Sequence, residues 1–219
     1  MATAAFISIA YLIGSLPFAV IVSRALRLPD PRSYGSGNPG ATNVLRTGRK
    51  LAALLTLAGD GGKGWLAVFL AARYAAEYGV SSPVVAACGV AAFLGHVFPL
   101  FLGFKGGKGV ATAGGVLLAL DPWLGLAALA SWIVVALLLR YASLASIVAA
   151  VCAPVYGYFM SLRPGAVPAL VLIGVLIVWR HQGNIRNLLS GRERKIGEKD
   201  SLGSGAKAGD SKPPHAEKG

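Results

Sequence analysis

The decisive stretch is Gly103-Phe104-Lys105-Gly106-Gly107-Lys108-Gly109-Val110-Ala111-Thr112, a cationic and glycine-rich segment that separates two long apolar runs. Glycine lets backbone N–H groups approach a ligand closely, and the two lysines add positive charge. An apolar run that can form a helix begins near Val110. Exposed N–H groups, two cations and a helix N-terminus together predict an anion site, and phosphate is the usual anion.

The composition around this segment is that of a membrane protein. Of the 219 residues, 55% are hydrophobic and only 14% are charged, which is too apolar for an ordinary soluble domain. Residues 1–190 carry 14 Lys and Arg against 4 Asp and Glu, a net charge of +10. This excess fits both the cytoplasmic loops of a membrane protein and an anionic substrate. It does not predict nucleic-acid binding, because most of the bases lie at the ends of apolar segments.

Seven apolar spans are predicted, at residues 2–22, 51–77, 83–102, 110–120, 123–139, 144–160 and 167–179. The second span is interrupted by Gly59-Asp60-Gly61-Gly62-Lys63-Gly64, which predicts a broken helix or one that starts near the membrane interface. Residues 110–120 are short for a crossing of ~20 residues, so the fourth helix is expected to begin inside the glycine-rich segment.

The charge distribution orients these spans. Seven alternating crossings place 12 of the 14 bases before residue 190 on one side, and only Arg73 and Arg163 on the other. The richly basic side is the cytoplasm by the positive-inside rule. The predicted fold is therefore an all-α integral membrane protein with seven transmembrane helices, its N-terminus outside and its C-terminus cytoplasmic. Residues 1–190 form the predicted membrane domain, and the polar residues 191–219 a disordered cytoplasmic tail.

Polar segments from four parts of the chain are expected at this cytoplasmic face. They are residues 36–46, residues 60–64, residues 95–109 and residues 180–184, with Ser143 at the same face. Arg46, Lys105 and Lys108 are candidate anion ligands, because glycines and hydroxyl or amide side chains surround them. Arginine binds a phosphate bidentately, whereas lysine acts as a point charge.

Other kinds of site fit the sequence poorly. A nucleotide-binding P-loop needs Ser or Thr after its lysine and a strand before the loop, but Gly109 follows Lys108 and an apolar helix precedes the loop. No metal site is expected, since acids are scarce and His96 and His181 lie far apart in the sequence. A triad of Ser36, His181 and Asp60 is conceivable, although no G-x-S-x-G elbow is present.

Over residues 1 to about 195 the chain resembles the bacterial acyl-phosphate:glycerol-3-phosphate acyltransferases. The resemblance depends on three motifs in order, which are Ser36-Gly37-Asn38-Pro39-Gly40-Ala41-Thr42-Asn43, Asp60-Gly61-Gly62-Lys63-Gly64, and Gly95-His96-Val97-Phe98-Pro99 leading into residues 104–112. The pairs Arg180-His181 and Asn184-Ile185 match the last segment of the family.

The resemblance implies a seven-helix enzyme of the bacterial inner membrane with its active site on the cytoplasmic face. It implies transfer of a fatty acyl group from acyl phosphate to the 1-hydroxyl of glycerol 3-phosphate, the first acylation of phospholipid synthesis. The products are lysophosphatidic acid and inorganic phosphate. No cofactor or metal is implied, and a soluble enzyme that forms acyl phosphate is a candidate partner.

The family mechanism is substrate-assisted, with a phosphate oxygen of the donor taking the hydroxyl proton. Like the family, this chain lacks the His-x4-Asp motif of other glycerophosphate acyltransferases, because Leu100 follows His96 and Ile185 follows His181 at that spacing. By position, the residues that hold phosphate are Ser36, Arg46, Lys105 and Asn184, with the N–H groups of Gly106 and Gly107. The residues that orient glycerol 3-phosphate are Ser143, His181 and Arg46, with contributions from Lys108 and Asn43. Asp60, Lys63 and His96 are assigned a structural role.

A membrane transporter of phosphorylated solutes is the alternative. It is motivated by the interrupted second span and by the repeated Gly-Gly-Lys-Gly at residues 61–64 and 106–109, since transporters often use internal repeats with broken helices. The flanks of the two copies differ and no acidic ion-coupling site is visible, so the acyltransferase hypothesis is preferred.

Overall fold

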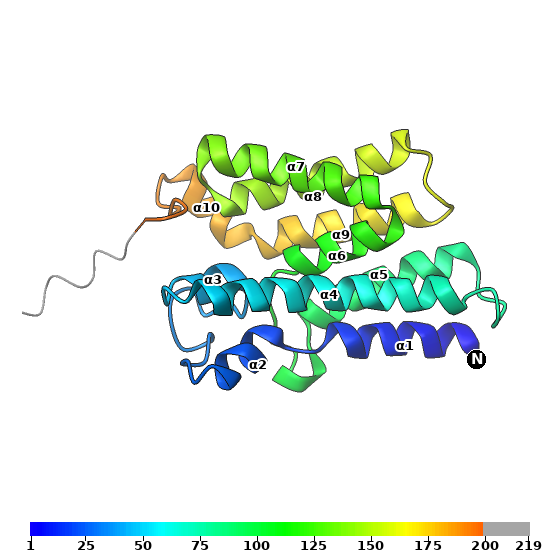
Figure 1. Ribbon diagram of the computed structural model, residues 1–219. Helices are drawn as coiled ribbons and strands as arrows, with labels where there is room; N and C mark the ends of the chain where they lie inside the picture. Colours follow the sequence, from blue (N-terminus) through cyan, green and yellow to red (C-terminus); the bar gives the residue numbers. More distant parts are fainter. Residues whose placement is uncertain (199–219) are drawn as a thin grey trace, which may run out of the picture.

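The computed structural model describes residues 1–198, and this part of the chain contains helices but no strands (Figure 1). The helices are α1 Ala2–Gly14, α2 Phe18–Ala25, α3 Ala41–Leu45, α4 Lys50–Tyr74, α5 Ser82–Val97, η1 Leu100–Leu102, α6 Val110–Leu120, α7 Pro122–Leu139, α8 Ala142–Phe159, α9 Ala166–Arg180 and α10 Gln182–Leu189. Most of the predicted tail, residues 199–219, lies outside the described part.

The long helices lie side by side, and the short helices mark one end of the bundle. Figure 1 shows α2, α3 and α10 together at the end opposite the N-terminus. Two of the apolar segments are bent: α1 and α2 meet at 40°, and α9 and α10 at 58°. The first bend contains Pro17, which has no N–H group to continue a helical hydrogen-bond ladder. The bends bring the short helices over the end of the bundle.

Helices occupy all seven predicted spans, which confirms the all-helical part of the fold prediction. Length and composition alone allow three of the described helical segments to cross a membrane, or up to five if each bent pair counts as one span. The helix α6 is shorter, and α4 carries Asp60 and Lys63 at its middle. The count of seven crossings and the orientation of the termini therefore stay predictions.

The prediction of a broken second span is wrong, because α4 is one continuous helix of 25 residues. Its glycines are explained by close packing against α6 instead. A Cβ on Gly64 would collide with the carbonyl oxygen of Thr112, and a Cβ on Gly115 would collide with that of Gly61. Small residues at such a contact let two helix backbones approach closely. Packing against α6 thus outweighs the low intrinsic helix propensity of glycine.

The fourth helix begins at Val110, directly after Gly109, and does not extend back through the glycines before it. The N-cap of α6 is Gly109, whose φ of +80° is a left-handed conformation that disfavours residues with a Cβ. A Cβ there would also collide with the ring of Phe93. Residues 103–109, called the glycine loop below, are therefore a connection between η1 and α6.

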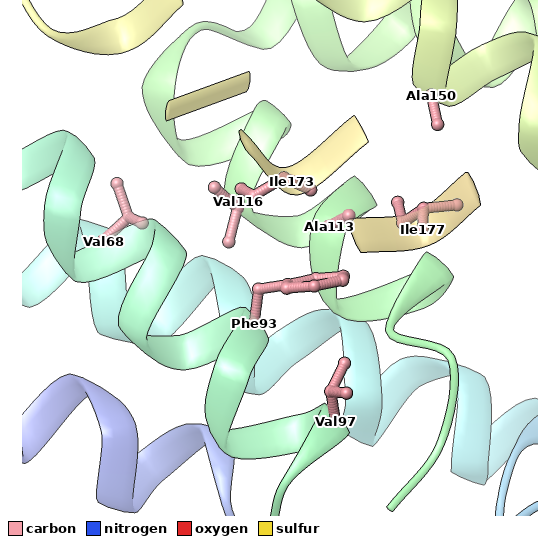
Figure 2. Packing of buried hydrophobic residues seen from close by; sticks show 8 residues of the cluster. All are labelled: Val68, Phe93, Val97, Ala113, Val116, Ala150, Ile173 and Ile177. Atoms are coloured by element: carbon pink, nitrogen blue, oxygen red, sulfur yellow. The ribbon is translucent and has the colours of Figure 1, made fainter. Parts of the chain in front are cut away.

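The main hydrophobic core lies next to the end of the glycine loop. It joins α4, α5, α6, α8 and α9 through Val68, Phe93, Val97, Ala113, Val116, Ala150, Ile173 and Ile177, all of them buried (Figure 2). The Phe93 ring in this core occupies the space beside Gly109. Core packing therefore fixes the point at which the loop joins α6.

Candidate active site

The glycine loop is held by hydrogen bonds on both sides of its backbone. The N–H groups of Gly106 and Gly107 donate to the carbonyls of Val97 and His96, at 3.1 and 3.2 Å. From the other side, Arg180 donates through Nη2 to the Gly106 carbonyl at 3.2 Å and through Nε to the Gly107 carbonyl at 3.3 Å. The prediction that these two N–H groups bind phosphate is therefore wrong for this conformation, because both are already engaged by α5.

The side chain of Lys108 leads from the loop into a polar network. Its Nζ donates to the side-chain oxygen of Asn184 on α10. The Nδ2 of Asn184 donates to Glu193 Oε1 at 2.7 Å, and the hydroxyl of Ser143 on α8 donates to the same oxygen at 2.6 Å. The Glu193 carboxylate thus joins Ser143 to Asn184, and Asn184 joins them to Lys108. Glu193 lies beyond the predicted domain boundary at residue 190.

Residues 191–198, assigned to the tail from the sequence, fold back on the bundle. The N–H of Ile196 donates to the carbonyl of Arg140 at 2.6 Å, and Nη2 of Arg140 donates to the carbonyl of Ile196 at 3.0 Å. These two bonds hold the segment at the start of α8, where Ser143 is located. They explain how Glu193 reaches the network, while the division into two domains stays a prediction.

The network is a region of concentrated positive charge. Burial lowers the pKa of Lys108 from its ordinary value, the Glu193 carboxylate opposes that shift, and the charges of Arg180 and Arg46 add to it. The charge of Lys108 therefore interacts with those of Arg180, Arg46 and Glu193 in this network. Such a group is suited to binding an additional anion.

Asn43 on α3 shapes the loop that precedes this helix and contains Ser36. Asn43 is buried, and its Oδ1 accepts the N–H of Ser36 at 3.0 Å. Its Nδ2 donates to the carbonyls of Pro31 and Tyr34, at 2.7 and 3.2 Å. Both ends of the Asn43 amide are therefore used to shape the loop, which does not fit the predicted direct contact with substrate.

Ser36 on this loop and Arg46 at the C-cap of α3 are exposed. The Arg46 side chain lies beside Gly35, where a Cβ would collide with Asn43 Oδ1. The positive φ of Gly35, +59°, is a further reason for glycine at this position. The Arg46 guanidinium thus lies next to the residue that precedes Ser36.

His181 lies between α9 and α10 with its ring buried. Its Nδ1 is 2.8 Å from the carbonyl oxygen of Ile177. A carbonyl only accepts, so Nδ1 carries the proton and Nε2 of the neutral ring is left as an acceptor. The unprotonated Nε2 can therefore accept a hydrogen bond.

Comparison with known proteins gives the same assignment as the motifs. The family described as glycerol-3-phosphate acyltransferase matches residues 4–191 of the chain. The chain belongs to this family. The resemblance seen in the sequence is thereby confirmed.

Named relatives of the family cover nearly the whole chain. The glycerol-3-phosphate acyltransferase of Thiobacillus denitrificans is 59% identical over 87% of this chain and 95% of its own length. The enzyme of that name from Laribacter hongkongensis is 58% identical over 91% of this chain and 98% of its own length. The solved structures include PlsY (YgiH), an integral membrane glycerol 3-phosphate acyltransferase, in its glycerol 3-phosphate form. It is 38% identical to this chain and superposes with a TM-score of 0.83, over 90% of this chain and 96% of that one. Its lysophosphatidic acid form superposes with a TM-score of 0.82.

Not all of the residues predicted from the glycerol-3-phosphate acyltransferase motifs come together. Lys108, Ser143 and Asn184 join one network, with Arg46 close enough to influence the pKa of Lys108. Lys105 is exposed on the glycine loop. Its predicted role as a phosphate ligand stays a prediction.

Two residues of the site had no assigned role from sequence. Glu193 was placed in the tail because glycine and basic residues surround it. Arg180 belongs to the Arg180-His181 motif, but its two hydrogen bonds to the carbonyls of Gly106 and Gly107 depend on the conformation of the glycine loop. Among residues 1–198 there is no group of three or more His, Cys, Asp or Glu side chains that could hold a metal ion.

Proposed function

We propose that this chain transfers a fatty acyl group from acyl phosphate to the 1-hydroxyl of glycerol 3-phosphate, releasing lysophosphatidic acid and inorganic phosphate. The PlsY crystal structures are of a glycerol 3-phosphate form and a lysophosphatidic acid form, which correspond to the acceptor and the product of this reaction. The chain would act as an integral protein of the bacterial inner membrane, with its site facing the cytoplasm, where the basic loops are predicted to lie.

The observation that carries the proposal is the cationic network around Lys108, Asn184 and Ser143. It combines three positive charges with hydroxyl and amide donors at the end of the bundle where α3 and α10 lie (Figure 1). Both proposed substrates carry a phosphate group, so both are complementary to these charges. Positive charge aimed at developing negative charge is a large source of rate enhancement in acyl transfer.

The chemistry needs little more than such positioning. Acyl phosphate is a mixed anhydride, so its phosphate is already a good leaving group. The 1-hydroxyl oxygen attacks the acyl carbon, the bond from that carbon to the phosphate oxygen breaks, and the phosphate departs with the hydroxyl proton. The protein orients the two substrates and stabilises the charge, and no side chain has to act as general base.

We assign the roles within the site as follows. Ser36, Arg46, Lys105 and Asn184 hold phosphate, and Lys108 joins them because it donates to Asn184 at the centre of the network. Ser143, His181 and Arg46 orient glycerol 3-phosphate, with His181 Nε2 accepting a hydrogen bond from a glycerol hydroxyl. Glu193 aligns the donors of Ser143 and Asn184 through its Oε1.

The test is phosphate release by the purified protein in lipid. Acyl phosphate should yield inorganic phosphate and lysophosphatidic acid only when glycerol 3-phosphate is added, whereas acyl-CoA should not replace the donor. Release that does not depend on glycerol 3-phosphate, or equal use of acyl-CoA, would contradict the proposal. The transport alternative loses its main support with the continuous α4. Counterflow of labelled glycerol 3-phosphate in liposomes should therefore be absent.

A further inference from the structure

A buried charged cluster lies beside the glycine loop, outside the network described above. Asp60 and Lys63 are one turn apart on α4 and form an ion pair with Nζ to Oδ1 at 2.9 Å. His96 on α5 faces the same carboxylate oxygen, with its Nδ1 at 3.4 Å. The three side chains are at most 7% exposed. Charges in a membrane-embedded helix are costly, so their presence there calls for a specific role.

The lysine end of the cluster holds the bend between α1 and α2. Lys63 Nζ donates to the carbonyl oxygen of Leu16 at 2.7 Å. The same ammonium group lies 6.0 Å from the centre of the Phe18 ring at the start of α2. The Leu16 carbonyl also accepts the N–H of Phe18 at 3.1 Å, so Lys63 adds a side-chain donor at the break between the two helices. Lys63 therefore fixes the bend from which the chain continues toward Ser36 and Arg46.

The histidine end of the cluster holds the glycine loop. A Cβ on Gly107 would collide with Nε2 of the His96 ring, so the ring lies directly against the loop backbone. The carbonyl of His96 accepts the N–H of Gly107 at 3.2 Å. A small cavity of about 10 Å³ lies beside this contact, and its lining includes Asp60, His96, Gly107 and Pro39. His96 thus contacts the loop through both its side chain and its backbone.

We propose that Asp60, Lys63 and His96 are positioning residues for the acyl transfer: through Lys63 at the α1–α2 bend and His96 at Gly107, the cluster holds the loop before α3 and the glycine loop in the relative placement that the reaction requires. This proposal builds on the proposed function. It differs from a purely structural role because both outer contacts of the cluster are made to segments that lead into the site. Arg180 supports the outer side of Gly106 and Gly107, and His96 supports the inner side.

The first experiment changes the contact between His96 and Gly107 by substituting each residue alone and then both together. Gly107→Ala should lower kcat/KM by about 100-fold, since a displacement of about 1 Å near a reacting centre has that effect. His96→Ala removes the ring that the new methyl group meets. The double variant Gly107→Ala with His96→Ala should then regain about tenfold over Gly107→Ala alone. A double variant whose loss equals the product of the two single losses would overturn the proposal.

The second experiment remains decisive if those variants fold poorly. Asp60→Asn with Lys63→Met keeps the shape of the cluster and leaves no unpaired charge, an exchange that proteins often tolerate. The double variant should keep the apparent Tm of the parent but lose about tenfold in kcat/KM, because Met cannot donate to the Leu16 carbonyl. Parent kinetics in a folded double variant would show that the cluster serves stability alone and would overturn the proposal.

A matched control lies one turn earlier on α4. Thr56 is fully buried, and its hydroxyl makes no hydrogen bond within residues 1–198. Thr56→Val should leave both kinetic constants unchanged, which separates the effect of the cluster from a general disturbance of α4. Failure of the proposed function would be distinguishable, because the parent protein itself would then show no release dependent on glycerol 3-phosphate.

Discussion

The sequence Gly-Gly-Lys-Gly occurs twice, and its two copies have different structures. Residues 61–64 make up about one turn of the continuous helix α4, whereas residues 106–109 form an irregular connection that ends at the N-cap of α6. In the first copy Lys63 is buried and paired with Asp60. In the second, Lys108 reaches across to Asn184 on another helix. Local sequence alone therefore does not decide the conformation of this tetrapeptide.

The surroundings of each copy explain the difference. Helix-forming residues continue on both sides of residues 61–64, and the backbone of α6 packs against Gly64. Residues 106–109 instead follow Pro99 and η1, and their N–H groups find acceptors at the end of α5. The comparison teaches that glycine next to lysine serves close helix packing in one place and an irregular loop, the proposed ligand site, in the other.

The largest expected effect comes from replacing the two lysines separately. Lys108→Met should reduce kcat/KM by about 10²–10³-fold with little change in apparent Tm, because it removes a charge directed at substrate phosphate. Lys63→Met should instead destabilise the protein by about 3–5 kcal/mol, because it leaves the buried Asp60 carboxylate unpaired. Kinetics in lipid and thermal unfolding distinguish the two. A similar pattern of losses in both variants would contradict the distinction between the copies.

The second effect concerns the packing of α4 on α6. Gly64→Ala should destabilise the protein by about 1–3 kcal/mol, because the new methyl group meets the Thr112 carbonyl. The apparent Tm in detergent measures the change. An unaltered Tm would mean that the two helices can separate at this contact without cost.

The third effect is a pH dependence of substrate binding. Burial lowers the pKa of Lys108, so this lysine loses its charge at a lower pH than an ordinary lysine does. The KM for glycerol 3-phosphate should therefore rise as the pH increases through that lowered pKa, by at most about tenfold for each pH unit. Lys108→Arg keeps its charge and should move the rise to higher pH. An identical alkaline limb in both proteins would assign the titration to another group.

The smallest effect is expected at Gly62, the neighbour of Gly61 on α4. A Cβ at this position meets nothing within 4 Å. Gly62→Ala should stabilise the protein by about 0.5–1 kcal/mol, because alanine loses less conformational freedom in a helix interior. Comparing the Tm of Gly62→Ala with that of Gly64→Ala measures which glycines of residues 61–64 the packing of α4 on α6 requires. A loss of stability at Gly62 would reveal a contact that the helix packing does not show.

The sequence could predict the helices but not all of their details. Apolar runs of sufficient length indicate helices in a membrane, where backbone groups have to be satisfied within the segment. The glycines at 59–64 were misinterpreted as a break because their partner, the α6 backbone, is distant in sequence. Propensity is a weak guide where tertiary packing decides.

The site was predictable to a similar extent. Motifs identified Lys108, Ser143 and Asn184, whose polar side chains are conspicuous among apolar helices. They could not reveal that the N–H groups of Gly106 and Gly107 are used by α5, since this depends on the path of the loop. Glu193 was missed for another reason: its role arises from the backbone bonds of Ile196 to Arg140, which leave no pattern in the sequence.

The short length of α6 has a consequence for how the two substrates meet. Its 11 residues extend for about 16 Å, roughly half the thickness of a bilayer's hydrocarbon core. Because the first turn of α6 lies beside Gly64, the glycine loop joins α6 next to the middle of α4. Under the proposed function, a long-chain donor would present its reactive carbonyl to the loop while its hydrocarbon tail stays in the lipid. The water-soluble acceptor would come to the membrane, and the donor would not have to leave it.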